Sequence, residues 1–401
     1  MDRTGLAEAQ AAIERGDFDQ ARALLEALLV AAPNDVNALN LRTVLALRER
    51  DYLRAGDVSA QAFAQHPNHP TLRANRVLSL RRLAGQQGEV GDHDAAAALL
   101  IEALGIDPAD QESRAMLLGQ AMRLAQSIGA PASLQTKVLP EKPPTISVIT
   151  CSINATRRAR FETSLNTHFA GLPVELIVLE DARSLAEAYN RGIARSTGDL
   201  LVFCHDDIEF ARPDFAARLL DALSSYDVVG VAGCTQLTGP NALWSGPASG
   251  YCQIAHVGPT GEWLSSLYGL GPVRVEGVQA LDGVFIACHR HVAETLRFDA
   301  DRFDHFHLYD TDFSWRAFAA GYRVAVAQDL LLIHHSLGDF NETWQEHAAR
   351  FMTKFPQLPR TPAHPARVLM QPNRRELLLP TLAWLADWQA RATALSVSGH
   401  R

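Results

Sequence analysis

The sequence predicts a multidomain protein in which helical repeats are followed by an α/β domain with a Rossmann-like, mainly parallel sheet. The chain has 401 residues, more than one average domain holds. A short motif recurs in its N-terminal third, and short apolar runs alternate with polar segments after a proline-rich linker. We place the helical repeats in residues 1–130, the linker in 131–145, the α/β domain in 146–359 and a C-terminal helical extension in 360–401.

The N-terminal repeats share a Gly-Asp or Arg-Asp start and a proline at their end. The three copies run from Gly16 to Pro33, from Arg50 to Pro67 and from Gly91 to Pro108, and the first two start 34 residues apart. This pattern resembles the tetratricopeptide repeat, a pair of helices with a period of about 34 residues. Such modules offer concave grooves, so we expect this region to bind a protein partner or a protein acceptor.

Four apolar, largely β-branched runs predict the strands of the α/β domain. They occupy residues 146–150, 174–179, 200–204 and 228–232, and polar, helix-compatible segments lie between them. This alternation is typical of a buried parallel sheet with helices on its faces. Because ligands of open α/β sheets gather beyond the carboxyl ends of the strands, the residues that follow each run are candidates for chemistry.

The composition narrows the class of protein. The formal net charge of −8 argues against a general nucleic-acid binder, and the lack of a GxxxxGKS/T loop argues against a P-loop enzyme. No stretch of the sequence has the length and apolarity of a signal peptide or a transmembrane helix. The five cysteines show no CxxC spacing. We therefore expect a cytoplasmic protein, with peripheral contact to the inner face of the membrane as the alternative.

The third apolar run ends in the most informative segment, His205-Asp206-Asp207. Adjacent carboxylates repel each other unless a cation or a basic group lies near them. Mg²⁺ or Mn²⁺ is satisfied by one or two carboxylates together with the oxygens of a diphosphate. Such an ion would neutralise a nucleotide diphosphate as it leaves. The alternative is that these residues begin a turn or cap a helix.

Three motifs together resemble a family 2 glycosyltransferase of the GT-A type. They are VLEDARSLAEAYNRG at 178–192, FCHDD at 203–207 and YDTDFSWR at 309–316. The closest subgroup is the streptomycin-biosynthesis-type glycosyltransferase-like family, and the resemblance covers about residues 143–338. It implies a GT-A fold and an inverting, metal-dependent hexosyltransferase that takes its sugar from a nucleotide-diphosphate sugar.

The resemblance also implies roles for residues at the strand ends. Thr150 and Asp181 would line the nucleotide pocket, with Arg183 and Asp206 as further nucleotide contacts. His205-Asp206-Asp207 matches the Asp-x-Asp site of the family, so Asp207 is the expected metal ligand. His205 occupies the place of the usual first aspartate, which puts tight metal binding in question.

The segment 308–316 supplies the candidate catalytic base. In an inverting transfer, one carboxylate takes the proton of the acceptor hydroxyl while the nucleotide leaves from the opposite face. The resemblance gives Asp310 this role, with Asp312 and Arg316 as its support. The alternative is that all three are charges on a helix surface, where Asp312 and Arg316 would form an i,i+4 pair.

Two further segments belong to the acceptor half. Gly283 would permit close approach of the backbone to a sugar, and Asp282 would either bind a sugar hydroxyl or form a turn. The run LLLIHHSLG at 330–338 ends in paired histidines, one of which completes the metal shell in several GT-A enzymes. We expect His335 rather than His334 to do so, with the other histidine as a contact to the diphosphate.

Aromatic residues in the Gly/Pro-rich span 239–271 are candidates for sugar stacking. They are Trp244, Tyr251, Trp263 and Tyr268. Loops deliver such side chains to binding sites, but a loop can also use them as an apolar plug.

Two other functions remain open from the sequence. A non-catalytic scaffold would use the repeats for binding and keep a degenerate sugar-nucleotide domain, and His205 in the place of an aspartate favours this reading. A nucleotidyltransferase would also bind a nucleotide diphosphate with a metal on an α/β sheet. Retention of Asp207, Asp310 and the histidine pair favours the glycosyltransferase.

Overall fold

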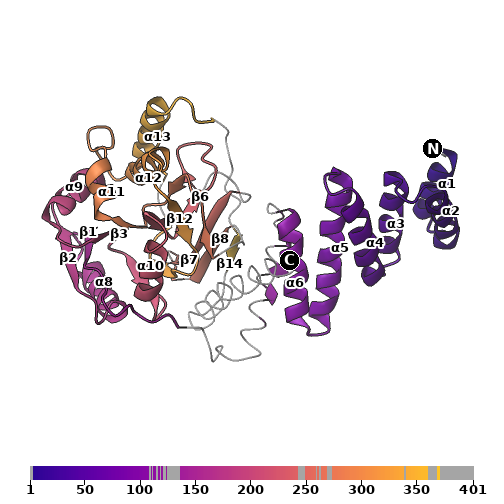
Figure 1. The fold of residues 1–401 in the computed structure, drawn as a ribbon, viewed down its shortest axis with the longest axis horizontal. Helices are drawn as coiled ribbons and strands as arrows, with labels where there is room; N and C mark the ends of the chain where they lie inside the picture. The colour runs from indigo at the N-terminus through magenta and orange to yellow at the C-terminus, as the bar shows by residue number, and fades with distance from the viewer. Residues whose placement is uncertain are drawn as a thin grey trace. The chain divides into compact units, whose positions relative to one another are not determined.

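The computed structural model of the chain consists of two compact units, Met1–Ser127 and Ile128–Arg401 (Figure 1). The residues that it describes are 3–107, 110, 112–113, 116–117, 119–120, 123, 136–242, 249–258, 260–261, 263–268, 273–337, 340–359 and 368–370. Within the predicted helical extension, Val368–Met370 forms a strand, not a helix. The rest of that extension and residues 131–135 of the predicted linker lie outside the described residues.

The first unit is helical, as predicted. Its helices are α1 (Arg3–Arg15), α2 (Phe18–Ala31), α3 (Val36–Arg48), α4 (Tyr52–Gln65), α5 (Pro70–Glu89) and α6 (His93–Ile106). Consecutive helices pack against one another along the chain. Ala21, Ala55 and Ala96, at equivalent places in the three motifs, are fully buried. A methyl side chain at these places lets neighbouring helices approach closely.

The repeated motif forms the turn between two helices. Asp17, Asp51 and Asp92 each cap the following helix, because their side chains accept a hydrogen bond from the backbone N–H three residues later. The residue before each aspartate has a positive φ. This residue is glycine in the first and third copies, but Arg50 adopts φ 60° in the second. The turn therefore strains the one copy that lacks glycine.

The second unit is an α/β domain. Its strands are β1 (Ile146–Cys151), β2 (Val174–Leu179), β3 (Leu200–His205), β4 (Ile208–Phe210), β5 (Val228–Gly230), β6 (Ala232–Cys234), β7 (Gly250–Val257), β8 (Trp263–Tyr268), β9 (Arg274–Val275), β10 (Ala280–Leu281), β11 (Phe285–His289), β12 (Val324–Ala327), β13 (Leu332–His334) and β14 (Val368–Met370). Its helices are α8 (Ala155–His168), α9 (Leu185–Arg195), α10 (Phe215–Leu223), α11 (Arg290–Leu296), α12 (Tyr309–Ala319) and α13 (Glu342–Lys354). None of the helices in the described part of the chain is both long and apolar enough to cross a membrane.

Two sheets form the framework of this domain. The first has the strand order β2-β1-β3-β11-β5-β12-β9, and its β2-β1-β3 portion is parallel, as predicted. It is a mixed sheet, because β11 runs antiparallel to both β3 and β5. The second sheet has the order β10-β6-β7-β13-β4, and β8 joins β7 to β14. The fourth predicted strand is divided between them, with β5 in the first sheet and β6 in the second.

Helices cover both faces of the first sheet (Figure 1). Along β3, Leu201 and Phe203 belong to a core shared with α9, α11, α12 and α13. Val202 and Cys204 point to the other face and pack with α8 and α10. This alternation is the period of two expected of a strand that is buried on both sides.

Gly192 explains part of the ARSLAEAYNRG motif. A Cβ at this position of α9 would lie 2.3 Å from a side-chain carbon of Ile149 in β1. Glycine is therefore required for the helix to pack this closely on the sheet. Ser184, the third residue of the motif, caps α9 by accepting from the backbone N–H of Glu187.

Candidate active site

A cavity of about 480 Å³ lies where the ends of β3 and β13 approach the start of α12. Its polar lining includes His205, Asp282, Asp310 and His334. These residues come from four separate parts of the second unit. The cavity thus brings two histidines from strand ends together with the candidate base, beyond the carboxyl end of β3.

His205, Asp207 and His334 form a compact cluster at this cavity. Each offers one potential ligand atom, and these atoms lie within 4.8 Å of one another. His334 Nε2 is 3.3 Å from His205 Nδ1 and 3.3 Å from Asp207 Oδ1. One proton on His334 Nε2 cannot satisfy both of these acceptors. Asp207 is only 5% exposed, and among the described residues its Oδ1 has no hydrogen bond of acceptable geometry.

Tyr309 fixes the orientation of the His205 ring. The Tyr309 hydroxyl donates to the carbonyl of Gly283 at 3.2 Å and lies 3.2 Å from His205 Nε2. Because that hydroxyl has one proton, it accepts from the Nε2–H of His205, and Nδ1 of the neutral ring keeps its lone pair. Burial, followed by repulsion from His334, lowers the pKa of His205 and favours this neutral form. The bare Nδ1 faces Asp207 and His334.

The cluster fits a divalent cation. Burial alone would raise the pKa of Asp207, but the neighbouring His334 and His205 lower it below its usual value, so the carboxylate is ionised. Asp207 offers a buried carboxylate oxygen without a hydrogen bond, and two imidazole nitrogens lie beside it. These three atoms could together ligate a cation. Two nitrogen donors and one oxygen donor suit Mn²⁺ or a similar transition metal better than Mg²⁺, which prefers oxygen ligands.

His335 lies on the other side of the strand end. Its Nε2 is 2.7 Å from Glu209 Oε1, and its backbone N–H donates to the carbonyl of Asp207. Successive side chains of an extended chain point to opposite sides, so His334 and His335 cannot both face the cavity. The geometry selects His334 as the partner of Asp207, against the expectation from the sequence.

Asp310 is placed in the first turn of α12. Its Oδ2 accepts a hydrogen bond of 2.7 Å from the backbone N–H of Gly283. Burial, followed by repulsion from Asp282, raises the pKa of Asp310 to about 7. Leu308, just before the helix, has φ 62°, a strained conformation of the kind found at functional sites. A carboxyl group with a pKa near neutrality is suited to general base catalysis.

Gly283 and Asp282 form a tight turn against α12. A Cβ at Gly283 would lie 2.2 Å from the hydroxyl oxygen of Tyr309, so a side chain does not fit here. Asp282 Oδ1 accepts from the backbone N–H of Val284 at 3.0 Å, which is the turn role considered from the sequence. Asp282 also lines the cavity, where its charge acts on Asp310.

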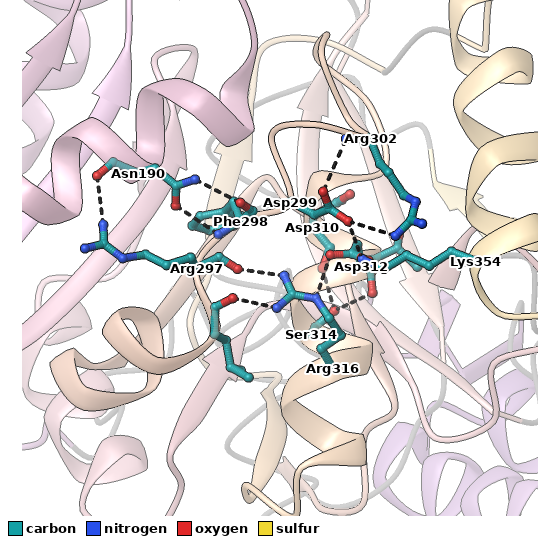
Figure 2. A network of polar contacts seen from close by, with 12 residues as sticks. Asn190, Arg297, Phe298, Asp299, Arg302, Asp310, Asp312, Ser314, Arg316 and Lys354 are labelled. Carbon is teal, nitrogen blue, oxygen red and sulfur yellow. Dashed lines mark hydrogen bonds and ion pairs between the residues drawn. The ribbon is translucent and has the colours of Figure 1, made fainter.

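A network of buried charges holds the helix that carries Asp310 (Figure 2). Asp312 is 0% exposed and accepts from Arg316 Nε at 2.8 Å and from Lys354 at the end of α13. Lys354 also donates to Asp299 at 2.6 Å. The predicted i,i+4 pair of Asp312 and Arg316 is present, with Asp312 buried and Arg316 partly buried, so it is not a pair of surface charges. The network ties α12 to α13 and to the segment before α12.

Four other residues expected at the nucleotide lie apart from the cavity lining. Thr150 is fully buried, and its hydroxyl donates to the carbonyl of Cys204 at 2.9 Å, so it links β1 to β3 instead of lining a pocket. Asp181 is exposed and accepts from Arg191 at 2.9 Å and 3.0 Å. Arg183 is exposed. Asp206 accepts from Ser152 at 2.7 Å across the ends of β3 and β1.

The aromatic lining of the cavity was not predicted from the sequence. Phe306, Tyr309, Phe340 and Trp344 contribute to it, whereas Tyr251 packs against the core instead. Trp244 lies outside the described residues. The sequence signal for these aromatic residues was weak, because Phe306 lies in an irregular loop and Phe340 precedes a helix. Their closeness to Asp310 depends on the fold, although Phe306 is only four residues away in the sequence.

The fold and this cavity define an α/β protein in which a His/Asp/His cluster that could hold a metal ion lies beside a carboxyl group of near-neutral pKa. Residues 147–355 match the model of a family described as the glycosyltransferase-like family, and the chain belongs to that family. No curated protein was found to match the sequence.

Among solved structures, the chain is similar to three transferases. The mannosyltransferase PcManGT from Pyrobaculum calidifontis, in complex with GDP-Man and Mn²⁺, is 15% identical with a TM-score of 0.36, covering 76% of this chain and 86% of that one. GalNAc-T7 with UDP, GalNAc and Mn²⁺ is 11% identical with a TM-score of 0.37, covering 53% and 48%. A mutant of the Thermobaculum terrenum O-GlcNAc transferase is 18% identical with a TM-score of 0.22, covering 44% and 36%.

Proposed function

We propose that this protein is an inverting glycosyltransferase that moves a hexose from a nucleotide-diphosphate sugar to an acceptor hydroxyl. The observation that carries the proposal is Asp310, a carboxyl group with a pKa of about 7 in the cavity lined by His205 and His334, the two histidines that cluster with Asp207. Membership of the glycosyltransferase-like family supports the reaction class. The motifs quoted above favour the streptomycin-biosynthesis-type branch of these proteins.

Asp310 acts as the general base in this proposal. Its Oδ2 accepts from the backbone N–H of Gly283, which orients the carboxyl group toward the acceptor hydroxyl in this proposal. A pKa near neutrality lets the carboxylate accept a proton in the transition state and release it afterwards. Asp312, Arg316 and Lys354 keep the helix of Asp310 in place.

Asp207, His205 and His334 would hold a divalent cation, and their two imidazole nitrogens favour a transition metal such as Mn²⁺ over Mg²⁺. When bound, such a cation neutralises charge on the departing nucleotide diphosphate. Tyr309 orients His205 for this task through the hydrogen bond at Nε2. In this arrangement His335 has no direct role and instead pairs with Glu209.

The nucleotide is proposed to bind at the ends of β1, β2 and β3. Asp181, Arg183 and Asp206 follow these strands and are the candidate contacts for its base, ribose and phosphates. Asp282 and Gly283, at the cavity, are candidates for contact with the sugars. Thr150 stabilises this region by linking β1 to β3, because its hydroxyl donates a hydrogen bond to the carbonyl of Cys204.

The first unit is proposed to be a tetratricopeptide module that binds a protein partner or a protein acceptor. The three capped turns and the buried alanines support the repeat assignment. A cavity of about 210 Å³ on this unit is lined by three arginines and two glutamates together with the apolar Leu25, Leu45 and Ala46. Such a charged hollow suits a polar or acidic segment of a partner.

A thermal-shift panel of nucleotide sugars, with and without Mn²⁺, tests the proposal. A ligand that binds the native state raises the midpoint by mass action. We expect one nucleotide class to shift the wild type, and Asp207→Ala to remove the Mn²⁺-dependent part of that shift. Asp310→Asn should keep the shift and abolish transfer. A wild type that no nucleotide shifts would favour the non-catalytic scaffold.

A further inference from the structure

Two exposed phenylalanines mark a part of the cavity that the proposed chemistry does not use. Phe306 is 49% exposed and Phe340 is 42% exposed. Among the residues that the structure describes, they are the two aromatic members of the set of exposed large hydrophobic side chains. Both line the cavity that contains Asp310. Exposed aromatic surface concentrated at one cavity indicates a ligand that covers it.

Phe340 is braced from one side by a tryptophan. Its ring centroid lies 5.1 Å from that of Trp344, and the two ring planes meet at 80°. Trp344 belongs to the first turn of α13 and is largely buried against the core of the domain. An edge-to-face pair of this kind limits rotation of the outer ring. Phe340 therefore presents an aromatic surface that is ordered by its support.

The polar side of the same cavity carries two carboxylates. Asp282 and Asp310 both line it, and Asp310 is the proposed base. A carboxylate accepts hydrogen bonds from hydroxyl groups, whereas the face of an aromatic ring is electron-rich and attracts C–H groups that carry partial positive charge. A ligand that satisfies both walls must have hydroxyl groups on its rim and C–H groups on its face. A pyranose ring has this distribution.

A long alkyl chain or a peptide fits these walls less well. An alkyl chain would place apolar surface beside Asp282 and exclude water from its carboxylate without offering a hydrogen bond in exchange, which is costly. A serine or threonine side chain would bring one hydroxyl to Asp310 but offers no ring face to the phenylalanines. The combination of aromatic and acidic walls favours a saccharide.

We infer that Phe306 and Phe340 form the acceptor subsite and that the acceptor is a saccharide or glycoside whose ring lies against them. This inference rests on the proposed function and specifies its acceptor class. The phenylalanines hold the ring through its C–H face, and Asp310 receives the proton of the hydroxyl that is glycosylated. In the transfer, the acceptor oxygen forms the bond to the anomeric carbon while the bond from that carbon to the diphosphate oxygen breaks.

The test measures acceptor kinetics with the nucleotide sugar that gives the largest thermal shift. Methyl glycosides of glucose, galactose, mannose and N-acetylglucosamine are compared with a serine-containing hexapeptide and with 1-octanol, by the release of nucleoside diphosphate. We expect transfer to a glycoside. Phe306→Ala and Phe340→Ala should each raise the KM for that glycoside by about tenfold, the effect of losing one aromatic contact. The thermal shift with the nucleotide sugar should be unchanged.

Two further variants separate stacking from general effects. Phe306→Leu keeps apolar volume but removes the flat face, so it should raise the KM nearly as much as Phe306→Ala. Leu53→Ala removes an exposed apolar side chain from α4 and should leave the kinetics unchanged.

Three results would overturn the inference. The first is preferred transfer to the hexapeptide or to octanol. The second is an unchanged KM in the phenylalanine variants, or a normal KM in Phe306→Leu. The third is a loss of the nucleotide-sugar shift in these variants, which would assign the phenylalanines to the donor. A wild type that binds no nucleotide sugar would instead reject the proposed function itself, and the inference with it.

Discussion

Replacing Gly283 with alanine should damage both the stability and the activity of the α/β domain. A Cβ built at this position lies 2.2 Å from the hydroxyl oxygen of Tyr309 and 2.8 Å from Cβ of Asp310. Neither neighbour can yield easily. Tyr309 is buried and its hydroxyl lies within hydrogen-bonding distance of Gly283 and His205, and Asp310 accepts from the Gly283 N–H.

The size of the effect follows from these contacts. Overpacking a filled site costs about 1–3 kcal/mol, and a strained or broken hydrogen bond adds about 1 kcal/mol. We therefore expect the free energy of unfolding of this domain to fall by about 2–4 kcal/mol. The rate of sugar transfer should fall by more than the loss of stability explains. The same displacement moves Asp310 and also Tyr309, the hydrogen-bond partner of His205.

Denaturant titration followed by tryptophan fluorescence measures this change. All six tryptophans lie between residues 244 and 388, within the second unit, so the signal reports on the domain that contains Gly283. Gly239→Ala is the matched control, because a Cβ there meets nothing within 4 Å. It should change the free energy of unfolding by less than about 0.5 kcal/mol. Equal stability and activity of Gly283→Ala and the wild type would refute the reasoning.

Three further predictions concern the metal cluster, the base and the repeat turn. His334→Gln should weaken the Mn²⁺-dependent thermal shift by at least about tenfold in apparent affinity, whereas His335→Gln should not; the reverse order would contradict the assignment. For Asp310 the folded pKa of about 7 lies above the ordinary value of 3.8, so the native state binds more protons than the unfolded state and stability declines as the pH rises from 3.8 to about 7. Urea midpoints from pH 4 to 8 should show this decline in the wild type and a smaller one in Asp310→Asn, and the kcat/KM of the wild type should rise with pH through about 7; parallel stability profiles would count against the raised pKa. Arg50→Gly should stabilise the helical unit by about 1 kcal/mol, measured by far-ultraviolet circular dichroism, because Arg50 occupies a left-handed turn; a loss of stability would show that its side chain contributes more than the strain costs.

The sequence by itself determined the local elements of both units. The aspartates at 17, 51 and 92 cap helices because the capping bond joins residues only three positions apart. The apolar runs at 146, 174 and 200 became strands because their composition suits burial on both faces. The acidic end of β3 was likewise found from residue type and position after a strand, whereas the Asp310 segment was found from its resemblance to a glycosyltransferase motif.

The tertiary structure decided which of these side chains share a site. Thr150 is the last residue of the first apolar run, where the nucleotide pocket was expected. Its hydroxyl instead donates a hydrogen bond to the carbonyl of Cys204 in β3. His334 and His335 are chemically equivalent in the sequence, and only the pairing of β13 with β4 and β7 sets which one meets Asp207. The choice depends on strands far away along the chain.

The pKa of Asp310 shows the same division between what the sequence determines and what the tertiary structure decides. The sequence identified Asp310 as a carboxylate in a suitable motif, but its pKa near neutrality comes from burial and from Asp282, 28 positions earlier. The aromatic pair Phe306 and Phe340 likewise becomes a surface only when the loop before α12 and the segment before α13 border one cavity. Helix caps and strand patterns are encoded by residues that are neighbours in the sequence. Burial, the coupling between charges and the direction in which a side chain points depend on residues that meet only when the chain is folded.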